Sequence, residues 1–400
     1  APAIRFKGFS DAWEQRKLGD IADIVGGGTP STGNQSYWDG DIDWYAPAEI
    51  ADQIYANSSQ KKITGLGYEN SSAKMLPPGT VLFTSRAGIG KTAILTRKGC
   101  TNQGFQSIVP HRGELDSYFI FSRTEELKRY GELVGAGSTF VEVSGKQMAV
   151  MELMMPPTMR EQQTIGGFFQ QLDHLITLHQ RKFEKLTNVK KSMLEKMFPQ
   201  NGSSYPEIRF KGFTDPWEQR KFGEITSKYE DPVPTPHDGY YRLGIRSHAK
   251  GTFHSYVAKG QELETAQMHR VAAGNFIVNI TFGWEHAVAI TDKNDAGKLV
   301  SHRFPQFSFA EGMVPEFFRY VIVDEKFRHH LWLSSPGGAG RNRVLKLDEM
   351  LNYLMRFPSR DEQIKIAEFF RQLDNLITLH QRELEKLQNI KKSMLEKMFV

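Results

Sequence analysis

Apolar residues recur at steps of three and four along two stretches of the chain, near residues 160–198 and 361–399. On an α-helix this spacing gathers the apolar side chains into one stripe, whereas a strand would alternate at every second position. Each stripe continues for about forty residues, which correspond to about 60 Å of helix. A stripe this long suits the seam of a coiled coil better than a lone surface helix. The expected seam residues are Leu172, Leu175, Leu186 and Met193 on the first helix and Leu373, Leu376, Leu387 and Met394 on the second.

Both helices carry the same start signal. Thr158-x-x-Glu161 and Ser359-x-x-Glu362 each follow a proline directly. The hydroxyl of such a cap accepts a hydrogen bond from the backbone N–H three residues on, and the carboxylate reaches back to the cap. The segment Pro199–Pro206 (PQNGSSYP) then ends the first helix and supplies a linker.

The sequence contains an internal repeat. Ile4–Asp20 and Ile208–Glu224 are identical at 13 of 17 positions, and Pro157–Phe198 and Pro358–Phe399 are identical at 29 of 42. The segments between the repeated parts barely resemble each other, so a constant part and a variable part alternate twice. We predict globular domains at residues 1–155 and 201–356, and helical segments at residues 156–200, with the linker, and 357–400.

The variable segments have a different texture. They carry short β-rich runs bounded by Gly, Pro, Asn and Asp, and helical stretches intervene. The runs are Thr80–Thr84, Ala93–Thr96, Asn275–Ile280 and Ala287–Ile290, and the helical stretches are Ser117–Tyr130 and Pro315–Leu333. The predicted fold class is α+β: two domains of mixed, mostly antiparallel sheet with helices, separated by two long helices that form an antiparallel coiled coil.

Composition excludes several classes of protein. With one cysteine, Cys100, the chain has no internal disulfide and no cysteine-built zinc site, and we interpret Cys100 as a small buried apolar residue. His179 and His380 fall on the seams, where we interpret them as packing or register residues. No apolar run is long enough to cross a membrane, and the first residues contain no signal-peptide core, so we expect a cytoplasmic protein.

The net charge of +5 permits a polyanionic partner without demanding one. The pairing of two equivalent helices suggests more, because it would give the chain an approximate two-fold axis. Duplex DNA has two-fold axes of its own, and dimeric readers exploit them with half-sites about one turn, ~34 Å, apart. Two different domains on such a frame would read different half-sites.

The alternation and its motifs resemble the specificity subunits (HsdS) of type I restriction-modification systems over essentially the full chain. The first half carries the resemblance in GGGTPST at Gly26–Thr32, LPPGTVLFTSRAGIGKTAI at Leu76–Ile94 and TNQGFQSIVP at Thr101–Pro110. The second half adds YYRLGIRSHAKGTFH at Tyr240–His254 and a second copy of the E-Q-x-x-I-x-x-F-F pattern at Arg360–Phe370.

The resemblance implies a bipartite DNA reader that catalyses nothing. Each variable domain would be a target recognition domain for double-stranded DNA. Two methyltransferase (modification) subunits would bind the chain, and motor-nuclease (restriction) subunits would join the full complex. S-adenosylmethionine, ATP and Mg²⁺ would be used by these partners, and no cofactor or metal would be bound by this chain.

Candidate DNA-contacting residues are those that can reach base edges or phosphates: Arg, Lys, Asn and Gln, with hydroxyl and aromatic groups beside them. In the first domain they are Thr29, Ser31, Asn34, Gln35, Tyr37, Trp38, Ser85, Arg86, Lys91, Asn102 and Gln103. In the second they are Tyr241, Arg242, Arg246, Ser247, His248, Lys250, Asn279, Trp284, His286, Arg341, Asn342 and Arg343. Arg86 suits a structural ion pair equally well, and Trp13 and Trp217, at equivalent repeat positions, suit the core.

Two other classes of function remain open to test. The segment Ser85–Thr92 nearly spells a phosphate-binding loop, but Ser85 stands where that motif needs glycine. Neither Pro77-Pro78 nor Pro156-Pro157 has the flanking residues of a DNA methyltransferase tetrapeptide, and no Pro-Asp dipeptide marks a nuclease core. A self-contained nuclease or methyltransferase is therefore the main rival, and a coiled-coil adaptor that binds only protein is the third hypothesis.

Overall fold

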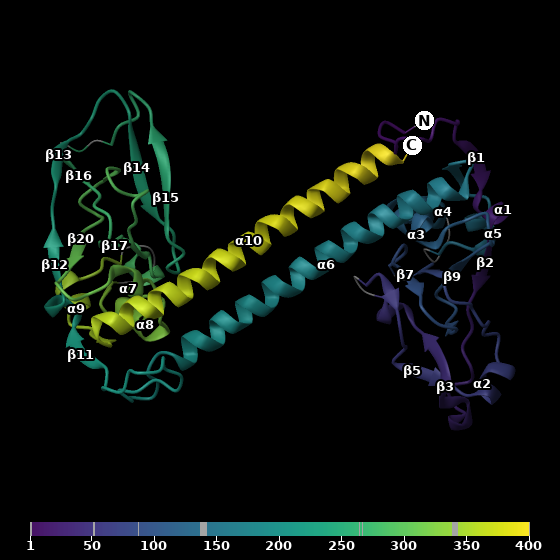
Figure 1. Cartoon of the computed structure of the whole chain (residues 1–400), viewed down its shortest axis with the longest axis horizontal. Helices are drawn as coiled ribbons and strands as arrows, with labels where there is room; N and C mark the ends of the chain where they lie inside the picture. The colour runs from purple at the N-terminus through teal and green to yellow at the C-terminus, as the bar shows by residue number, and fades with distance from the viewer. Residues whose placement is uncertain are drawn as a thin grey trace. The chain divides into compact units, whose positions relative to one another are not determined.

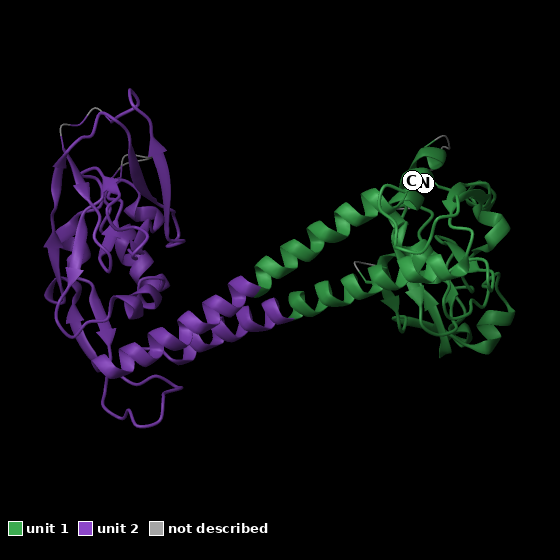
Figure 2. Ribbon diagram, turned by 45° about the horizontal axis from the view of Figure 1, so that its top comes forward, with its two compact units in different colours: residues 1–181, 380–400 green, residues 182–379 purple. Residues whose placement is uncertain are grey.

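The computed structural model describes residues 2–50, 53–86, 88–136, 142–263, 265, 267–337 and 343–399. The chain divides into two compact units, which Figure 2 colours separately. Unit 1 contains residues 1–181 and 380–400, and unit 2 contains residues 182–379. The division runs through both long helices, so each unit holds one part of each helix.

The two long helices form as predicted. They are α6 (Met159–Lys196) and α10 (Arg360–Met398), labelled in Figure 1. The Thr158 hydroxyl accepts a hydrogen bond from the Glu161 N–H at 3.3 Å, which is the first half of the expected cap. The second half is wrong, because the Glu161 carboxylate binds the Arg5 guanidinium at 2.6 and 2.7 Å.

The helices pair antiparallel within each unit. In unit 1, Lys391 forms an ion pair with Asp173 at 2.6 Å, and His380 meets His179 with their Nδ1 atoms 3.1 Å apart. The residue numbers of the contacting partners therefore rise along α6 as they fall along α10. Unit 2 has the matching ion pair of Lys190 with Asp374 at 2.5 Å.

Six of the eight predicted seam residues pack into the cores of their units. Leu172, Leu387 and Met394 do so in unit 1, and Leu186, Met193 and Leu373 in unit 2. The prediction is wrong for the other two, because Leu175 is 40% exposed and Leu376 is 44% exposed. The next seam position after Leu172 and Leu373 lies four residues on, and in both helices it is a half-buried isoleucine. Leu175 and Leu376 lie one residue before these isoleucines and therefore face outward.

Unit 1 is built on a five-stranded sheet of order β2-β9-β6-β7-β4, a three-stranded sheet β5-β3-β8, and the pair β1-β10. Among the described strand pairs of unit 1, only β4–β7 and β3–β8 are parallel. The strands are β1 Glu14–Lys17, β2 Ala22–Gly26, β3 Trp38–Tyr45, β4 Tyr55–Ala56, β5 Lys61–Ile63, β6 Val81–Phe83, β7 Thr92–Leu95, β8 Cys100–Thr101, β9 Gln106–Pro110 and β10 Glu152–Met155. The helices are α1 Leu18–Ile21, η1 Gln35–Tyr37, η2 Pro47–Glu49, α2 Gly65–Glu69, α3 Ser117–Ser122, α4 Thr124–Gly135 and α5 Gly145–Ala149.

Unit 2 has sheets of order β12-β20-β17-β18 and β13-β16-β19-β14-β15, and the pair β11-β21. Within the part of unit 2 that the structure describes, only the β14–β19 pair is parallel. The strands are β11 Glu218–Lys221, β12 Thr226–Tyr229, β13 Pro232–Pro234, β14 Tyr240–Ile245, β15 Thr252–Val257, β16 Gln267–Arg270, β17 Phe276–Val278, β18 Val288–Ile290, β19 Leu299–Val300, β20 Gln306–Phe309 and β21 Leu354–Phe357. The helices are η3 Phe222–Glu224, η4 Gly283–Glu285, α7 Pro315–Val321, α8 Glu325–Leu333 and α9 Leu347–Leu351.

The α+β fold class is confirmed, and the predicted strands and helices lie where the sequence placed them. Strands β6, β7, β17 and β18 are buried at every position, which explains their continuous apolar sequences. The two predicted helical stretches each break into two helices. One break lies at Arg123, whose side chain is buried, and the other precedes Asp324, which caps α8.

One buried ion pair joins the two repeated parts of the sequence in each unit. In unit 1 it is Arg5 with Glu161, whose side chain is 1% exposed, and the Trp13 indole N–H also donates to that carboxylate at 3.2 Å. The hydrogen bond to Glu161 raises the pKa of the Arg5 guanidinium. In unit 2, Arg209 binds Glu362 with the same two hydrogen bonds, 2.8 and 2.7 Å long.

A phenylalanine that follows each long helix completes the core of each unit. Phe399, at the end of α10, stacks on Phe169 with ring centroids 5.8 Å apart and lies 6.4 Å from Trp13. In unit 2, Phe198 follows α6 and lies 5.6 Å from Trp217. The prediction that both tryptophans are core residues is confirmed, since Trp13 and Trp217 are buried.

We expect Arg5→Ala to lower the free energy of unfolding of unit 1 by about 3–5 kcal/mol, because it leaves the buried Glu161 carboxylate without its counter-charge. Urea unfolding or hydrogen exchange measures the effect. Lys7→Ala, which removes an exposed charge on the same segment, is the control. Equal effects of the two substitutions would show that the buried pair does not hold the unit together.

Candidate nucleic-acid interface

The structure brings three candidate segments of unit 1 together. The Thr29 hydroxyl donates to the Gln103 side chain, and the Gly28 N–H donates to the Thr101 carbonyl at 2.9 Å. At Gly27 a Cβ atom would lie 2.0 Å from the Asn102 carbonyl oxygen, so only glycine allows the loop to approach this closely. The glycine-rich loop therefore lies on residues 101–104.

The turn after β6 joins the same surface. The Ser85 N–H donates to the Gly104 carbonyl at 2.8 Å, and the Asn102 side chain accepts from the Gly104 N–H. Lys91 is exposed on this turn, and Arg86 forms an ion pair with Glu142 at 3.8 Å while its side chain stays 38% exposed. Arg86 thus has the structural ion pair that the sequence allowed, and it also remains accessible.

Several candidate side chains in the glycine-rich loop have roles within the loop itself. Asn34 accepts from the Ser36 N–H and so caps η1, and Gln35 donates to Asp39 at 3.1 Å. Trp38 is half-buried and lies edge-on to Trp44, with ring centroids 5.1 Å apart. Ser31 is exposed, and Tyr37, also half-buried, follows at the end of η1.

One interpretation in unit 1 is wrong. The side chain of Ser85 is fully buried, so it is not available for contact with DNA. The apolar strand that precedes it continues into the turn, because Ser85 lies between the backbone partners Gly104 and Val143.

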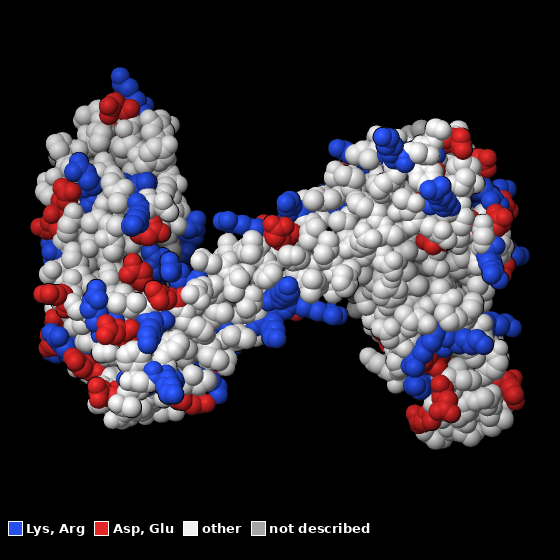
Figure 3. Space-filling model, viewed as in Figure 1, with Lys and Arg blue, Asp and Glu red and all other residues white. Residues whose placement is uncertain are grey.

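The sequence reasoning missed a group of basic residues on the small sheet of unit 1. Lys61 and Lys62 lie on β5, and the Lys61 ammonium lies 5.9 Å from the centre of the Trp38 ring. Arg97 binds the buried Asp43 at 2.7 Å. On the face shown in Figure 3, Lys and Arg gather with acidic residues over the region of β3 and β5. The adjacent basic pairs at the ends of short strands were the available signal.

Burial opposes ionisation of Asp43, but hydrogen bonds from Ser59 and the nearby charges of Arg97 and Lys62 outweigh it. The pKa of the Asp43 carboxyl is therefore below its usual value. A carboxylate that stays ionised holds both cations on the surface of the sheet.

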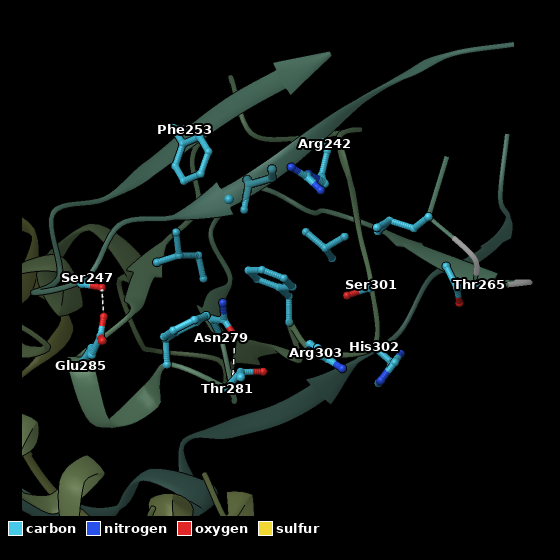
Figure 4. Close-up of a pocket in the computed structure, with 17 residues that line it drawn as sticks. Arg242, Ser247, Phe253, Thr265, Asn279, Thr281, Glu285, Ser301, His302 and Arg303 are labelled. Carbon is cyan, nitrogen blue, oxygen red and sulfur yellow. Dashed lines mark hydrogen bonds between the residues drawn. The ribbon is translucent and has the colours of Figure 1, made fainter. Parts of the chain in front are cut away.

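The candidate residues of unit 2 also come together, around a cavity of about 680 Å³. Arg242, Ser247 and Asn279 line it, as Figure 4 shows. The cavity lies between the hairpin β14–β15 and the turn that carries η4. Its lining also includes Phe253, Glu285, Ser301, His302 and Arg303, which the sequence reasoning did not single out. The basic dipeptide His302–Arg303, which follows β19 after a single serine, was the available signal.

Other candidates lie on the same hairpin, β14–β15, and in its turn. Tyr241 and Tyr256 are opposite each other in the strand register, each is 58% exposed, and their ring centroids are 5.2 Å apart. The Arg246 guanidinium lies 5.3 Å from the centre of the Phe253 ring. His248 and Lys250 are exposed in the turn between the strands.

The turn after β6 and the turn after β17 close with the same kind of backbone hydrogen bond. Thr84 N–H donates to Lys91 O in unit 1, and Asn279 N–H donates to Ala287 O in unit 2. The Trp284 indole N–H donates to Thr281 O at 3.2 Å within this turn. Next to it, the Arg343 guanidinium lies 4.9 Å from the centre of the Trp332 ring. Arg341 and Asn342 lie outside the described residues.

The interpretation of His286 as a DNA contact is wrong. Its side chain is 3% exposed, and its Nε2 atom lies 2.7 Å from the Ile322 carbonyl oxygen. Burial lowers the pKa of the His286 imidazole, so the neutral ring donates this hydrogen bond. His286 therefore joins the turn to helix α7 and does not face solvent.

Within the described ranges, no three His, Cys, Asp or Glu side chains gather as metal ligands. Among the same residues, no helix is both long and apolar enough to cross a membrane. Cys100 is buried, and burial raises its thiol pKa to about 11.

Comparison with known proteins relates the chain to one family. Residues 10–188 match the family described as Type I restriction modification DNA specificity domain. The chain is 32% identical over 222 residues to the type I restriction enzyme MjaIX specificity subunit of Methanocaldococcus jannaschii. The aligned part covers 53% of this chain and 51% of that protein. It is 26% identical over 170 residues to the EcoR124I/EcoR124II specificity subunit of Escherichia coli, covering 40% of this chain and 41% of that one. The matched part thus spans about half, or less, of these relatives.

Two further comparisons cover almost the whole chain. The MjaVIII specificity subunit of Methanocaldococcus jannaschii is 21% identical over 96% of this chain and 91% of its own. The crystal structure of the type I restriction-modification S subunit from M. genitalium covers 100% of this chain and 99% of its own, with a TM-score of 0.61 and 11% identity. At this identity the structural likeness shows that the fold is shared.

The burial of His286 predicts a pH dependence. On unfolding, the pKa of the imidazole returns to about 6.5, so below that pH the unfolded chain binds a proton that the folded unit 2 does not. Stability should therefore fall as the pH drops through about 6.5, by at most about 1.4 kcal/mol per pH unit, and level off below the folded pKa.

His286→Asn should remove this component, and asparagine tolerates the left-handed backbone at φ +61°. Thermal unfolding from about pH 7.5 to about pH 5.5 compares the two proteins, and other titrating groups cancel between them. The same loss of stability in both would mean that His286 does not titrate with unfolding.

Proposed function

We propose that this chain, which belongs to the family of type I restriction-modification specificity subunits, reads a DNA target in two parts, one with each unit. The observation that carries the proposal is that each unit is built on an equivalent frame and presents a different surface. The frame is the set of contacts that hold the long helices, the repeated N-terminal segment and the domain together. Arg5–Glu161 and Arg209–Glu362 repeat one contact of that frame, and the hydrogen bonds of Tyr118 to Asp173 and of Tyr320 to Asp374, both 2.9 Å, repeat another.

The two surfaces differ in the way that two half-sites require. Unit 1 offers a glycine-rich loop with hydroxyl, amide and basic groups, and unit 2 offers a cavity lined by Arg242, Asn279 and Arg303. Arg and Lys bind guanine edges and phosphates, and Asn and Gln bind adenine edges. Different residues on equivalent frames support the reading of different sequences.

The chemistry of the system would come from partners. In this proposal the chain is a non-catalytic scaffold for two methyltransferase subunits and for motor-nuclease subunits, and those subunits use S-adenosylmethionine, ATP and Mg²⁺. Its proposed partner is double-stranded DNA, and we propose that the chain acts in the cytoplasm.

Equivalent apolar residues on the two helices support the binding of two copies of one partner. In unit 1, Leu175 and Leu178 are 40% and 37% exposed on α6. In unit 2, Leu376 and Leu379 are 44% and 51% exposed on α10. Exposed leucines three residues apart on a helix are the anchors that a partner helix packs against. Their repetition suits two identical methyltransferase subunits.

Exchange of residues 20–156 for the matching segment of a relative with another target tests the two-reader proposal. We expect one half-site of the methylated sequence to change and the other to stay as it was, because each surface belongs to one unit. Mapping of methylated positions in a genome that carries the exchanged gene gives the result. A change in both half-sites, or in neither, would contradict the proposal.

The double substitution Leu175→Glu with Leu178→Glu tests the docking of partners. It should reduce the number of bound methyltransferase subunits from two to one, since the leucines of unit 2 are untouched. Native mass spectrometry of the co-expressed complex measures the stoichiometry. Gln171→Glu, an exposed change of charge on the same helix, is the control. Retention of two subunits by the leucine variant would place the docking site elsewhere.

A further inference from the structure

The cavity of unit 2 has an unusual distribution of charge. Its volume of about 680 Å³ lies within the range of pockets that bind small molecules, about 300–1,000 Å³. Arg242, His302 and Arg303 line it, and Glu285 is the one carboxylate among its described lining residues. Figure 4 shows Glu285 beside Ser247, at some distance from the labelled basic side chains.

The Glu285 carboxylate is positioned by a neutral donor. The Ser247 hydroxyl donates to its Oε2 atom at 2.6 Å. In the part of the chain that the structure describes, Glu285 forms no ion pair, although two arginines line the same cavity. A carboxylate has about four acceptor positions, so this half-buried group keeps most of its hydrogen-bonding capacity for a ligand.

The local fold does not depend on this carboxylate. The His248 N–H donates to the Glu285 backbone carbonyl at 2.9 Å, and the Ala249 N–H donates to the His286 carbonyl at 2.8 Å. These backbone hydrogen bonds join the hairpin turn to the turn of η4 whatever side chain stands at position 285. The acidic group is therefore free to serve another purpose.

An acidic group on a surface that approaches a polyanion costs binding energy unless it forms a specific hydrogen bond. In the major groove only two base groups are hydrogen-bond donors, the N4 amino group of cytosine and the N6 amino group of adenine. We infer that the cavity receives a base edge, and that Glu285 accepts a hydrogen bond from the exocyclic amino group of an adenine or a cytosine. This inference rests on the proposed function and names one recognition contact within it.

The basic residues of the cavity fit the same role. Arg242 and Arg303 offset the repulsion between the carboxylate and the DNA backbone. Ser247 is a positioning residue, because its hydroxyl fixes the carboxylate without pairing its charge.

The test uses the full chain assembled with its methyltransferase subunits and a pool of duplexes randomised in the half-site of unit 2, which the exchange of residues 20–156 leaves unchanged. Sequencing of the retained DNA should show one position restricted to adenine or cytosine. In Glu285→Gln the amide both donates and accepts, so guanine and thymine become acceptable there. Discrimination at that position should fall by about tenfold, and the other positions should keep their preferences.

Two variants control the experiment. Ser247→Ala should relax the same position by a smaller factor, because the carboxylate remains and only its orientation is lost. Glu316→Gln, the same chemical change at an exposed carboxylate on α7, should leave every position unchanged. Equal thermal unfolding midpoints would show that the variants fold alike.

Unchanged base preference in Glu285→Gln would overturn the inference and leave the proposed function intact, since a half-site would still be selected. Loss of selection at every position together with a lower unfolding midpoint would assign Glu285 a structural role and would also overturn it. If the unsubstituted protein selects no half-site in this pool, the proposed function itself fails.

Discussion

A buried carboxylate near the start of each long helix is the constraint on which the frame of this protein depends. Glu161 and Glu362 are each 1% exposed, and a buried charge without a partner would cost several kcal/mol. Arg5 and Arg209 supply the partner, and both belong to the repeated segment before each domain. The pairing therefore fixes where that segment lies on the helix. Loss of either partner would leave a buried charge unpaired.

The rest of the frame extends this arrangement. Lys391 and Lys190 each pair with an aspartate of the opposite helix, and that aspartate also accepts a hydrogen bond from a tyrosine of the domain. An aromatic residue after each helix, Phe399 or Phe198, closes the core. The tyrosine hydrogen bonds join this constant sequence to the variable part of each domain, which can vary elsewhere without loss of that contact.

This division of labour explains why the sequence alternates. Constant residues such as the exposed leucines suit a partner that is the same for every target. Under the proposed function, variable residues are free to differ where each unit would meet its own DNA sequence. In unit 1 they form a loop that glycine allows to lie on its neighbour, and in unit 2 they enclose a cavity with one carboxylate. Selectivity in such a system comes from hydrogen bonds to base edges. A net charge of only +5 limits the non-specific attraction to phosphates, so these hydrogen bonds can contribute a large share of the binding energy.

The sequence by itself determined the long helices, the buried strands, the α+β class and the duplicated frame. These follow from local periodicity and from repetition, which need no knowledge of distant contacts. Only the tertiary structure decided which side of a helix or a turn each residue faces. Leu175 and Leu376 carry the right spacing for the seam, but a step of four residues in place of three turns them outward. Ser85 and His286 are polar residues in glycine-containing turns, yet neighbouring segments bury both. The sequence did not single out Glu285, because one acidic residue acquires meaning only when folding places it in a cavity that Arg242 and Arg303 also line.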